Sequence, residues 1–136
     1  MNYLLDTNIC SALINGTSDL ARQRYLRTAR PGRVPQTSSV VTHELWYGVS
    51  KSNRIVQNAN RLSAFLTNAV SVLEYSEQDS RAAGEIRAEL ERKGQRIGEY
   101  DTLIAGQALS RNLILVTANT REFGRVKGLM VEDWTV

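Results

Sequence analysis

The feature that most constrains this chain is a short apolar run, Leu-Ile-Leu-Val at residues 113–116. The run has the length of a strand, contains no polar residue and lies between segments with helical spacing. A strand that is apolar on both faces needs cover on both sides, and a parallel sheet between two helical layers provides it. Residues 2–5, Asn-Tyr-Leu-Leu, form a similar run. We therefore expect an α/β fold around a central, mainly parallel sheet.

The alternation of strand-length and helix-length segments favours the same fold. Only Pro31 and Pro35 interrupt it, in a segment that is typical of a loop. Ser76 and Asp79 form a capping-box pattern, and the helix that they begin is expected to end near Gly94. Strands are predicted at 2–5, 36–39, 71–75 and 113–116, with an edge strand at 129–132, and helices through 13–14 (capped by Asn8 or Ser11) and at 18–30, 40–49, 54–70, 76–94 and 100–108.

Two of these helices carry aromatic residues among their apolar positions. Trp46 lies beside the stripe formed by Val41, Leu45 and Val49. The helix at 100–108, which begins with Tyr100, is apolar enough to be mostly buried.

Length and composition indicate one soluble domain spanning residues 1–136. The single cysteine, Cys10, excludes an internal disulfide and a cysteine-based zinc site. No basic segment precedes the first apolar residues, so a secretory leader is not expected. No apolar run approaches the roughly 20 residues that cross a bilayer. We expect a cytoplasmic protein without a membrane contact.

The basic residues are concentrated in the first half of the chain. Residues 20–73 carry eight arginines and lysines against a single acid, Glu44, whereas residues 74–101 carry eight acids against five bases. Fourteen of the 17 basic residues are arginine, whose planar group suits bidentate phosphate contacts. The pattern indicates either a nucleic-acid partner, with Arg24 and Arg27 as candidate contacts, or a solvated helix face.

Polar side chains follow two predicted strands at the edge where an open parallel sheet binds its ligands. Asp6 directly follows the run at 2–5, and Thr117 directly follows the run at 113–116. Two acids on helices are candidates for the same crevice: Glu44, set in an apolar helix face, and Asp101, near a helix start. A carboxylate in an apolar face is costly to bury unless it is paired or binds a cation.

Each acid also has a simpler interpretation when it is taken alone. Asp6 could serve only as a helix N-cap, Glu44 could point to water, and Asp101 could interact with the helix dipole. The only histidine, His43, adjoins Glu44 on one helix and therefore points about 100° away from it, which favours a structural or surface role.

Taken together, the acids form a set of oxygen ligands without cysteine or histidine, which suits a hard cation such as Mg²⁺ or Mn²⁺. Beside an arginine-rich surface, such a set predicts phosphodiester hydrolysis with a metal-activated water. No side-chain nucleophile is then required, and Cys10 has no convincing base. Walker A, Gly-x-Gly-x-x-Gly and Gly-x-Ser-x-Gly patterns are absent from the sequence.

The ordered motifs Asp-Thr-Asn (6–8), Glu-Leu-x-x-Gly (44–48), Tyr-Asp-x-Leu-Ile-Ala (100–105) and Leu-Val-Thr-x-Asn-Thr-x-x-Phe (115–123) resemble those of PIN-domain ribonucleases. The similarity covers the whole chain and is greatest to the VapC toxins of bacterial VapBC toxin–antitoxin pairs. It implies a PIN-like three-layer α/β/α fold and a Mg²⁺-dependent endoribonuclease that acts on RNA, with tRNA as a candidate, and so blocks translation. It further implies a homodimer, a VapB-type antitoxin, and DNA contact only through that antitoxin.

The resemblance also implies roles for individual residues. Asp6, Glu44 and Asp101 match the acidic triad of the family, which is catalytic and binds the metal. Asn8 and Thr117 match polar residues that support the site. Asn119 stands where many members have a fourth acid, so a second metal ion is less expected here. Glu99, an extra acid next to Tyr100, is a further departure and is expected to face solvent.

Three other classes of protein fit the sequence less well. A receiver-type phosphoacceptor domain would need an acceptor Asp at the strand predicted at 71–75, which offers Glu74 instead, and a Lys directly after residue 117, where Ala118 stands. A phosphatase of the haloacid-dehalogenase type would need a second Asp where Asn8 stands. A non-catalytic RNA-binding relative would not need Asp6, Glu44 and Asp101 together.

Overall fold

The computed structural model describes residues 2–136 and contains a five-stranded sheet in which every neighbouring pair is parallel. The strand order is β3-β2-β1-β4-β5, so the first strand lies at the centre. Leu5 is in register with Thr37 on one side and with Val116 on the other. The strands are β1 (Tyr3–Leu5), β2 (Gln36–Ser38), β3 (Ser71–Leu73), β4 (Ile114–Val116) and β5 (Val131–Glu132).

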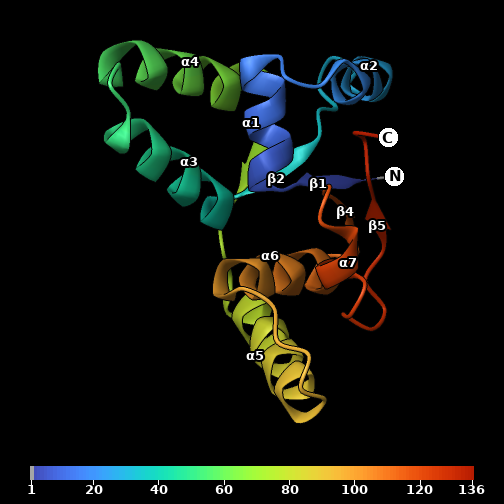
Figure 1. Ribbon diagram of the computed structural model, residues 1–136. Coiled ribbons are helices and arrows are strands. Elements are labelled where there is room, and N and C mark those ends of the chain that lie inside the picture. Colours follow the sequence, from blue (N-terminus) through green and yellow to red (C-terminus); the bar gives the residue numbers. More distant parts are fainter. Residues whose placement is uncertain (1) are drawn as a thin grey trace.

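Helices cover both faces of this sheet, which confirms the predicted three-layer α/β/α fold (Figure 1). One layer contains the first four helices and the other contains the last three. The helices are α1 (Thr7–Asn15), α2 (Asp19–Thr28), α3 (Ser39–Lys51), α4 (Ile55–Asn68), α5 (Glu77–Arg92), α6 (Glu99–Ser110) and α7 (Thr120–Phe123). Among residues 2–136, no helix is long and apolar enough to span a membrane.

The two central strands form the core, as their composition predicts. Leu4, Leu5, Leu115 and Val116 are fully buried because helices pack on both faces of the sheet. The C-terminal segment completes this core with Trp134, which is also fully buried and stacks edge-on against Tyr3 of β1.

All predicted strands and long helices are present, with differences at particular residues. The N-cap of α1 is Asp6 rather than Asn8 or Ser11. Helix α6 is largely buried, as predicted, although Tyr100 in its first turn is 47% exposed, and Trp46 of α3 is 38% exposed. Successive helix residues are 100° apart, so Trp46 cannot share the inward direction of Leu45.

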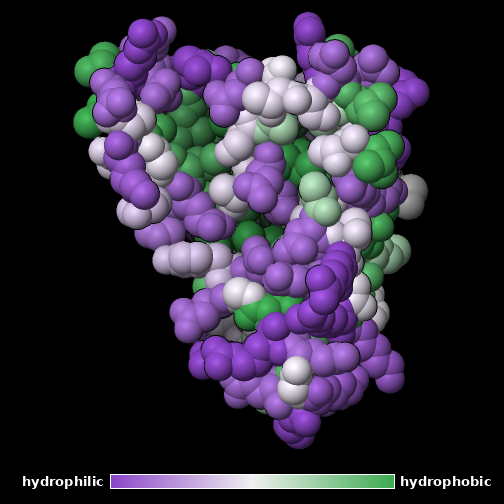
Figure 2. Space-filling view, viewed as in Figure 1, coloured by the Kyte–Doolittle hydropathy of each residue, from purple (hydrophilic) through white to green (hydrophobic). Residues whose placement is uncertain are grey.

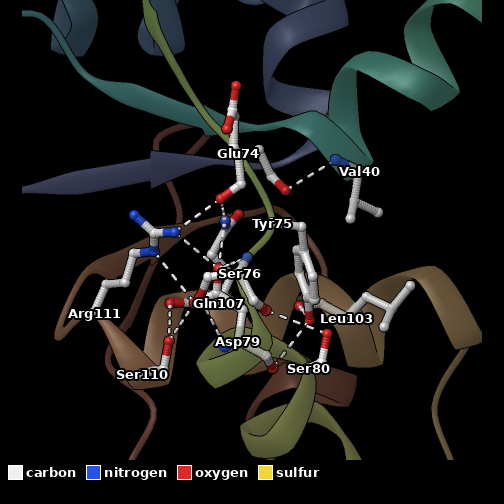
Figure 3. A network of polar contacts seen from close by, with 11 residues as sticks. Val40, Glu74, Tyr75, Ser76, Asp79, Ser80, Leu103, Gln107, Ser110 and Arg111 are labelled. Atoms are coloured by element: carbon white, nitrogen blue, oxygen red, sulfur yellow. Dashed lines mark hydrogen bonds and ion pairs between the residues drawn. The ribbon is translucent and has the colours of Figure 1, made fainter.

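The capping box predicted at the start of α5 belongs to a larger polar network (Figure 3). Ser76 accepts a hydrogen bond from the Asp79 amide, and the Asp79 carboxylate accepts one from the Ser76 amide. The same carboxylate receives further bonds from Gln107, Ser110 and Arg111 of the neighbouring segment, and its ion pair with Arg111 spans 2.9 Å. Asp79 therefore fixes α5 against α6 as well as capping its own helix.

Asp79 is fully buried, yet it stays ionised. Burial opposes its charge, but the hydrogen bonds from Arg111, Ser110, the Ser76 amide and Gln107 outweigh burial and hold its pKa well below the ordinary value.

A glycine allows α5 and α6 to approach each other closely. A Cβ atom placed on Gly106 would lie 2.6 Å from the backbone nitrogen of Ala83, a distance that real Cβ atoms do not adopt. By contrast, a Cβ on Gly84, the next residue of α5, would meet nothing within 4 Å.

Candidate active site

The sheet places the predicted site residues at one edge. Asp6 follows β1 and Thr117 follows β4, and these neighbouring strands are parallel, so their carboxyl ends lie together. The chain runs from β1 to β2 on one side, whereas β4 lies on the other side. This change of direction is the switch point at which open α/β sheets bind their ligands. The first turns of α1, α3 and α6 converge on the same edge (Figure 1).

Asp6 is held rigidly at this switch point. It is 5% exposed, and as the N-cap of α1 its Oδ1 accepts a hydrogen bond from the Ile9 amide over 2.9 Å. Burial raises the pKa of Asp6, and repulsion from Glu44 adds to this, although hydrogen bonds from Thr117 and the amides of Ile9 and Asn8 oppose it. The N-cap interpretation is thus correct for Oδ1 of Asp6.

Glu44 enters the site from the second turn of α3 and is half-buried. Its Oε1 accepts a hydrogen bond of 2.5 Å from the hydroxyl of Thr7, the first residue of α1. Thr7 belongs to the predicted Asp-Thr-Asn cluster, but its contact with Glu44 was not predicted, because it joins residues far apart in sequence. The bond joins Glu44 of α3 to the first residue of α1, directly after Asp6.

Asp101 lies in the first turn of α6 and is the third acid of the cluster. Burial, followed by repulsion from Asp6, Glu44 and Glu122, raises the pKa of Asp101 to about 6. Glu122 belongs to α7, a helix of four residues that the sequence analysis did not predict. The structure therefore brings Asp6, Glu44 and Asp101 together and adds Glu122 to them.

The predicted supporting residues occupy three different environments. Thr117 is fully buried, and its Oγ1 accepts a hydrogen bond from the Asn119 amide over 2.9 Å. Asn119 is half-buried at the N-cap of α7, where its side chain makes no capping hydrogen bond. Asn8 is exposed on the first turn of α1. The two asparagine side chains are therefore available at the rim of the crevice.

His43, Cys10 and Glu99 have no catalytic contact within residues 2–136, in agreement with a structural or surface role for each. His43 is exposed, and its Nε2 lies 3.3 Å from the Tyr100 hydroxyl. Burial raises the pKa of the Cys10 thiol to about 12, which leaves it a poor nucleophile. Glu99 is exposed, as predicted.

The donor set suits a hard divalent cation. Within residues 2–136, no group of three or more Asp, Glu, His or Cys side chains is placed so that it could hold a metal ion. Mg²⁺, however, usually keeps several waters and binds through one or two carboxylates. The carboxylates of Asp6, Glu44 and Asp101 repel one another, and a cation between them would remove that repulsion.

An apolar hollow adjoins this cluster. A cavity of about 250 Å³ lies between α1, α3 and α4, with Thr7 and Glu44 at one end and Leu45, Val49 and Leu62 among its lining residues. Figure 2 shows apolar surface inside this hollow and polar side chains around it. The acidic cluster is thus continuous with a surface suited to an apolar ligand segment.

The two arginines predicted to contact RNA differ in their environments. Arg24 is ion-paired with Glu132 over 2.7 Å and lies over the ring of Trp134, so it anchors α2 to the C-terminal segment. Arg27, on the last turn of α2, is exposed.

Comparison with known families places this geometry in context. A profile of the PIN domain matches residues 3–129, which is nearly the whole chain. The chain therefore belongs to the PIN-domain family.

Individual relatives narrow this assignment. The chain is 42% identical over 135 residues to the tRNA(fMet)-specific endonuclease VapC of Shigella flexneri, covering 99% of each chain. It is 41% identical over 134 residues to ribonuclease VapC2 of Rickettsia felis, covering 98% of each. These similarities place the chain among the VapC ribonucleases, so the predicted resemblance and the nuclease class are confirmed.

Solved structures agree at the level of the fold. The VapBC2 complex of Rickettsia felis, bound to a promoter DNA fragment, superposes with a TM-score of 0.89 at 40% identity and covers 98% of this chain and 99% of its own. The DNA-bound VapBC of Salmonella typhimurium also gives a TM-score of 0.89, at 41% identity and 98% coverage of each chain.

Proposed function

We propose that this chain is a Mg²⁺-dependent endoribonuclease toxin that hydrolyses RNA phosphodiester bonds, with Mn²⁺ as a substitute metal. The observation that carries the proposal is the convergence of Asp6, Glu44 and Asp101 at the switch point of the sheet, where burial, and then repulsion between the carboxylates, raises the pKa of Asp101 to about 6. A site of this kind is poised for a cation, and phosphodiester hydrolysis is the chemistry that a cation and an oxygen-ligand set support.

The proposed roles follow from the contacts of each residue. Asp6 and Asp101 hold the metal, with Glu44 as a third ligand. When bound, the metal polarises a phosphoryl oxygen and lowers the pKa of a water molecule. Thr7 orients Glu44, and Thr117 orients Asp6. Asn8 and Asn119, at the rim, contact the substrate.

The proposed substrate is tRNA. The relative from Shigella flexneri is a tRNA(fMet)-specific endonuclease and matches this chain over nearly its full length. Initiator tRNA is therefore the first RNA to test, and its cleavage would block translation.

The proposed partner is a VapB-type antitoxin. Two structures that superpose on this chain with a TM-score of 0.89 are VapBC complexes bound to DNA, which supports such a partner and a DNA contact made through it. The hollow next to Glu44 offers an apolar surface on which an antitoxin segment would cover the acids. We further propose that residues 1–136 form a single PIN domain that acts as a homodimer in the cytoplasm.

Replacement of Asp101 tests the proposed chemistry. Asp101→Asn should reduce cleavage of labelled initiator tRNA at least ~100-fold. A neutral amide compensates less of the free energy that Mg²⁺ loses on dehydration than a carboxylate does. Calorimetric titration of the variant with Mg²⁺ should show correspondingly weaker binding. Excess chelator should abolish cleavage by the unmodified protein.

Glu99→Gln provides the matched control, because Glu99 is an exposed acid on the same helical turn. It should retain the activity of the unmodified protein. Full cleavage by the Asp101 variant, or cleavage that resists the chelator, would contradict the metal mechanism.

A further inference from the structure

A second, strongly basic cavity lies at the opposite edge of the sheet from the acidic cluster. It has a volume of about 370 Å³ and lies where β1 and β2 begin, beside the C-terminal end of α2. This end of α2 and the start of β1 lie on one side of the molecule, away from the first turns of α3 and α6 (Figure 1). Its polar lining includes Asn2, Thr28, Gln36 and three arginines, Arg27, Arg30 and Arg33, and contains no acid.

The backbone holds two of these arginines in a defined turn. The amide of Arg30 donates to the carbonyl of Arg33 over 3.2 Å, and the amide of Arg33 donates back over 2.8 Å. Gly32 closes the turn with a φ of +73°, which favours glycine. Nη1 of Arg30 also donates to the carbonyls of Arg27 and Ala29. The cavity is therefore built around a fixed guanidinium group, whose remaining N–H groups are available to a ligand.

No acidic side chain compensates these charges. Among the ion pairs between residues 2–136, none involves Arg27, Arg30 or Arg33. Arg24, one turn earlier on α2, is by contrast paired with Glu132. Three guanidinium groups around one cavity repel one another, and an anion that enters it relieves this repulsion. The planar donor fork of arginine fits phosphate oxygens in a bidentate manner.

We propose that Arg27, Arg30 and Arg33 form a non-catalytic site that binds a backbone phosphate of the RNA substrate. This inference rests on the proposed function. The strand between the two edges is three residues long, or about 10 Å at ~3.3 Å per residue. A phosphate here cannot be the one that is cleaved, but a folded RNA is large enough to reach both edges. The site thus selects for a structured polynucleotide over a short one.

The test measures how tRNA binding depends on salt. Fluorescein-labelled initiator tRNA is titrated with protein in chelator, so that binding is measured without cleavage, at several salt concentrations. The variant Arg27→Gln/Arg33→Gln removes two guanidinium groups and leaves the carbonyl contacts of Arg30 in place. Loss of this phosphate contact should lower the slope of log affinity against log salt by about one and weaken binding roughly tenfold near 0.1 M salt.

The matched control removes the same charge elsewhere. Arg22 and Arg54 are exposed and do not line the cavity. Arg22→Gln/Arg54→Gln should change tRNA affinity less than about twofold and should keep the slope. Thermal melting of both double variants by circular dichroism should give the melting temperature of the unmodified protein.

Four results would overturn the inference. The first is an unchanged slope for the cavity variant, and the second is an equal loss in the control, which would indicate net charge alone. The third is unchanged tRNA binding with lost antitoxin binding, which would assign the cavity to an acidic peptide. The fourth is displacement of tRNA from this site by millimolar inorganic phosphate alone, which would assign it to a free anion. If the unmodified protein does not cleave tRNA with Mg²⁺, the proposed function itself fails, and that result is visible before any arginine is changed.

Discussion

Burial and neighbouring carboxylates raise the pKa of Asp101 to about 6. This shift shows that it is unfavourable to keep several ionised carboxylates close together in this site. The sequence allowed Asp6, Glu44 and Asp101 to be predicted because each follows a strand or interrupts an apolar helix face. It did not allow the contact of Thr7 with Glu44, or the place of Glu122, to be predicted. Both depend on contacts between distant segments, and no local pattern encodes such contacts.

The amide at position 119 allows a prediction about metal affinity. An amide oxygen coordinates Mg²⁺ without charge, so Asn119→Asp should tighten metal binding by roughly tenfold and lower the metal concentration for half-maximal cleavage. The added acid should also lower the melting temperature of the metal-free protein, because it increases the repulsion on Asp6 and Asp101. Calorimetry measures the first effect, and melting in chelator measures the second.

Asn60→Asp, an exposed change in the middle of α4, is the control and should leave metal affinity unaltered. If the affinity of the Asn119 variant equals that of the control, position 119 lies outside the metal's ligand shell.

Among the helices and strands, local sequence signals were sufficient to predict some elements and not others. Apolar period, capping and glycine predicted α5 well, because all three agree along its sixteen residues. Helix α7 was missed because four residues are too few to show a helical period. The exposure of Tyr100 on the otherwise buried α6 was not predicted, because composition does not say which face of a helix a neighbour covers.

The contact between α5 and α6 gives a pair of opposite predictions. Gly106→Ala should destabilise the protein by about 1–3 kcal/mol, since the new methyl group collides with the backbone of Ala83. Gly84→Ala, on the open face of α5, should instead stabilise it by about 0.5–1 kcal/mol through helix propensity. Urea unfolding measures both, and equal effects of the two changes would disprove the close approach.

The buried carboxylate of Asp79 predicts how stability depends on pH. Its pKa is lowered in the folded state, so its stabilisation is present above the unfolded pKa of about 3.9 and is lost as pH falls below it. Asp79→Asn should cost about 3 kcal/mol at pH 7, because Arg111 loses its partner, and the cost should shrink below pH 4.

Urea unfolding between pH 3 and pH 7 tests this, with Glu85→Gln as the control. Glu85 pairs with Arg81 on the exposed face of the same helix, so its replacement should change stability by less than ~0.5 kcal/mol. An Asp79 variant whose stability loss does not vary with pH would contradict the assigned charge.

At the scale of the whole molecule, the layered α/β architecture was predictable because the strands at 3–5 and 114–116 are apolar on both faces. The order of the strands was not predictable in the same way. It depends on which distant edges pair, and hence on the packing of complete helices. The acids are brought together by this order, since β1 lies between β2 and β4.

The central position of β1 has a consequence for the synthesis of the protein. Its partner β4 is separated from it by most of the chain, so the middle of the sheet forms only after the ribosome has translated residues 114–116. Asp6 leaves the ribosome early but has no Thr117 beside it until then. A nascent chain of this protein is therefore unable to assemble its acidic crevice before residues 114–117 have been translated, and only a cell that has translated them is exposed to the finished crevice.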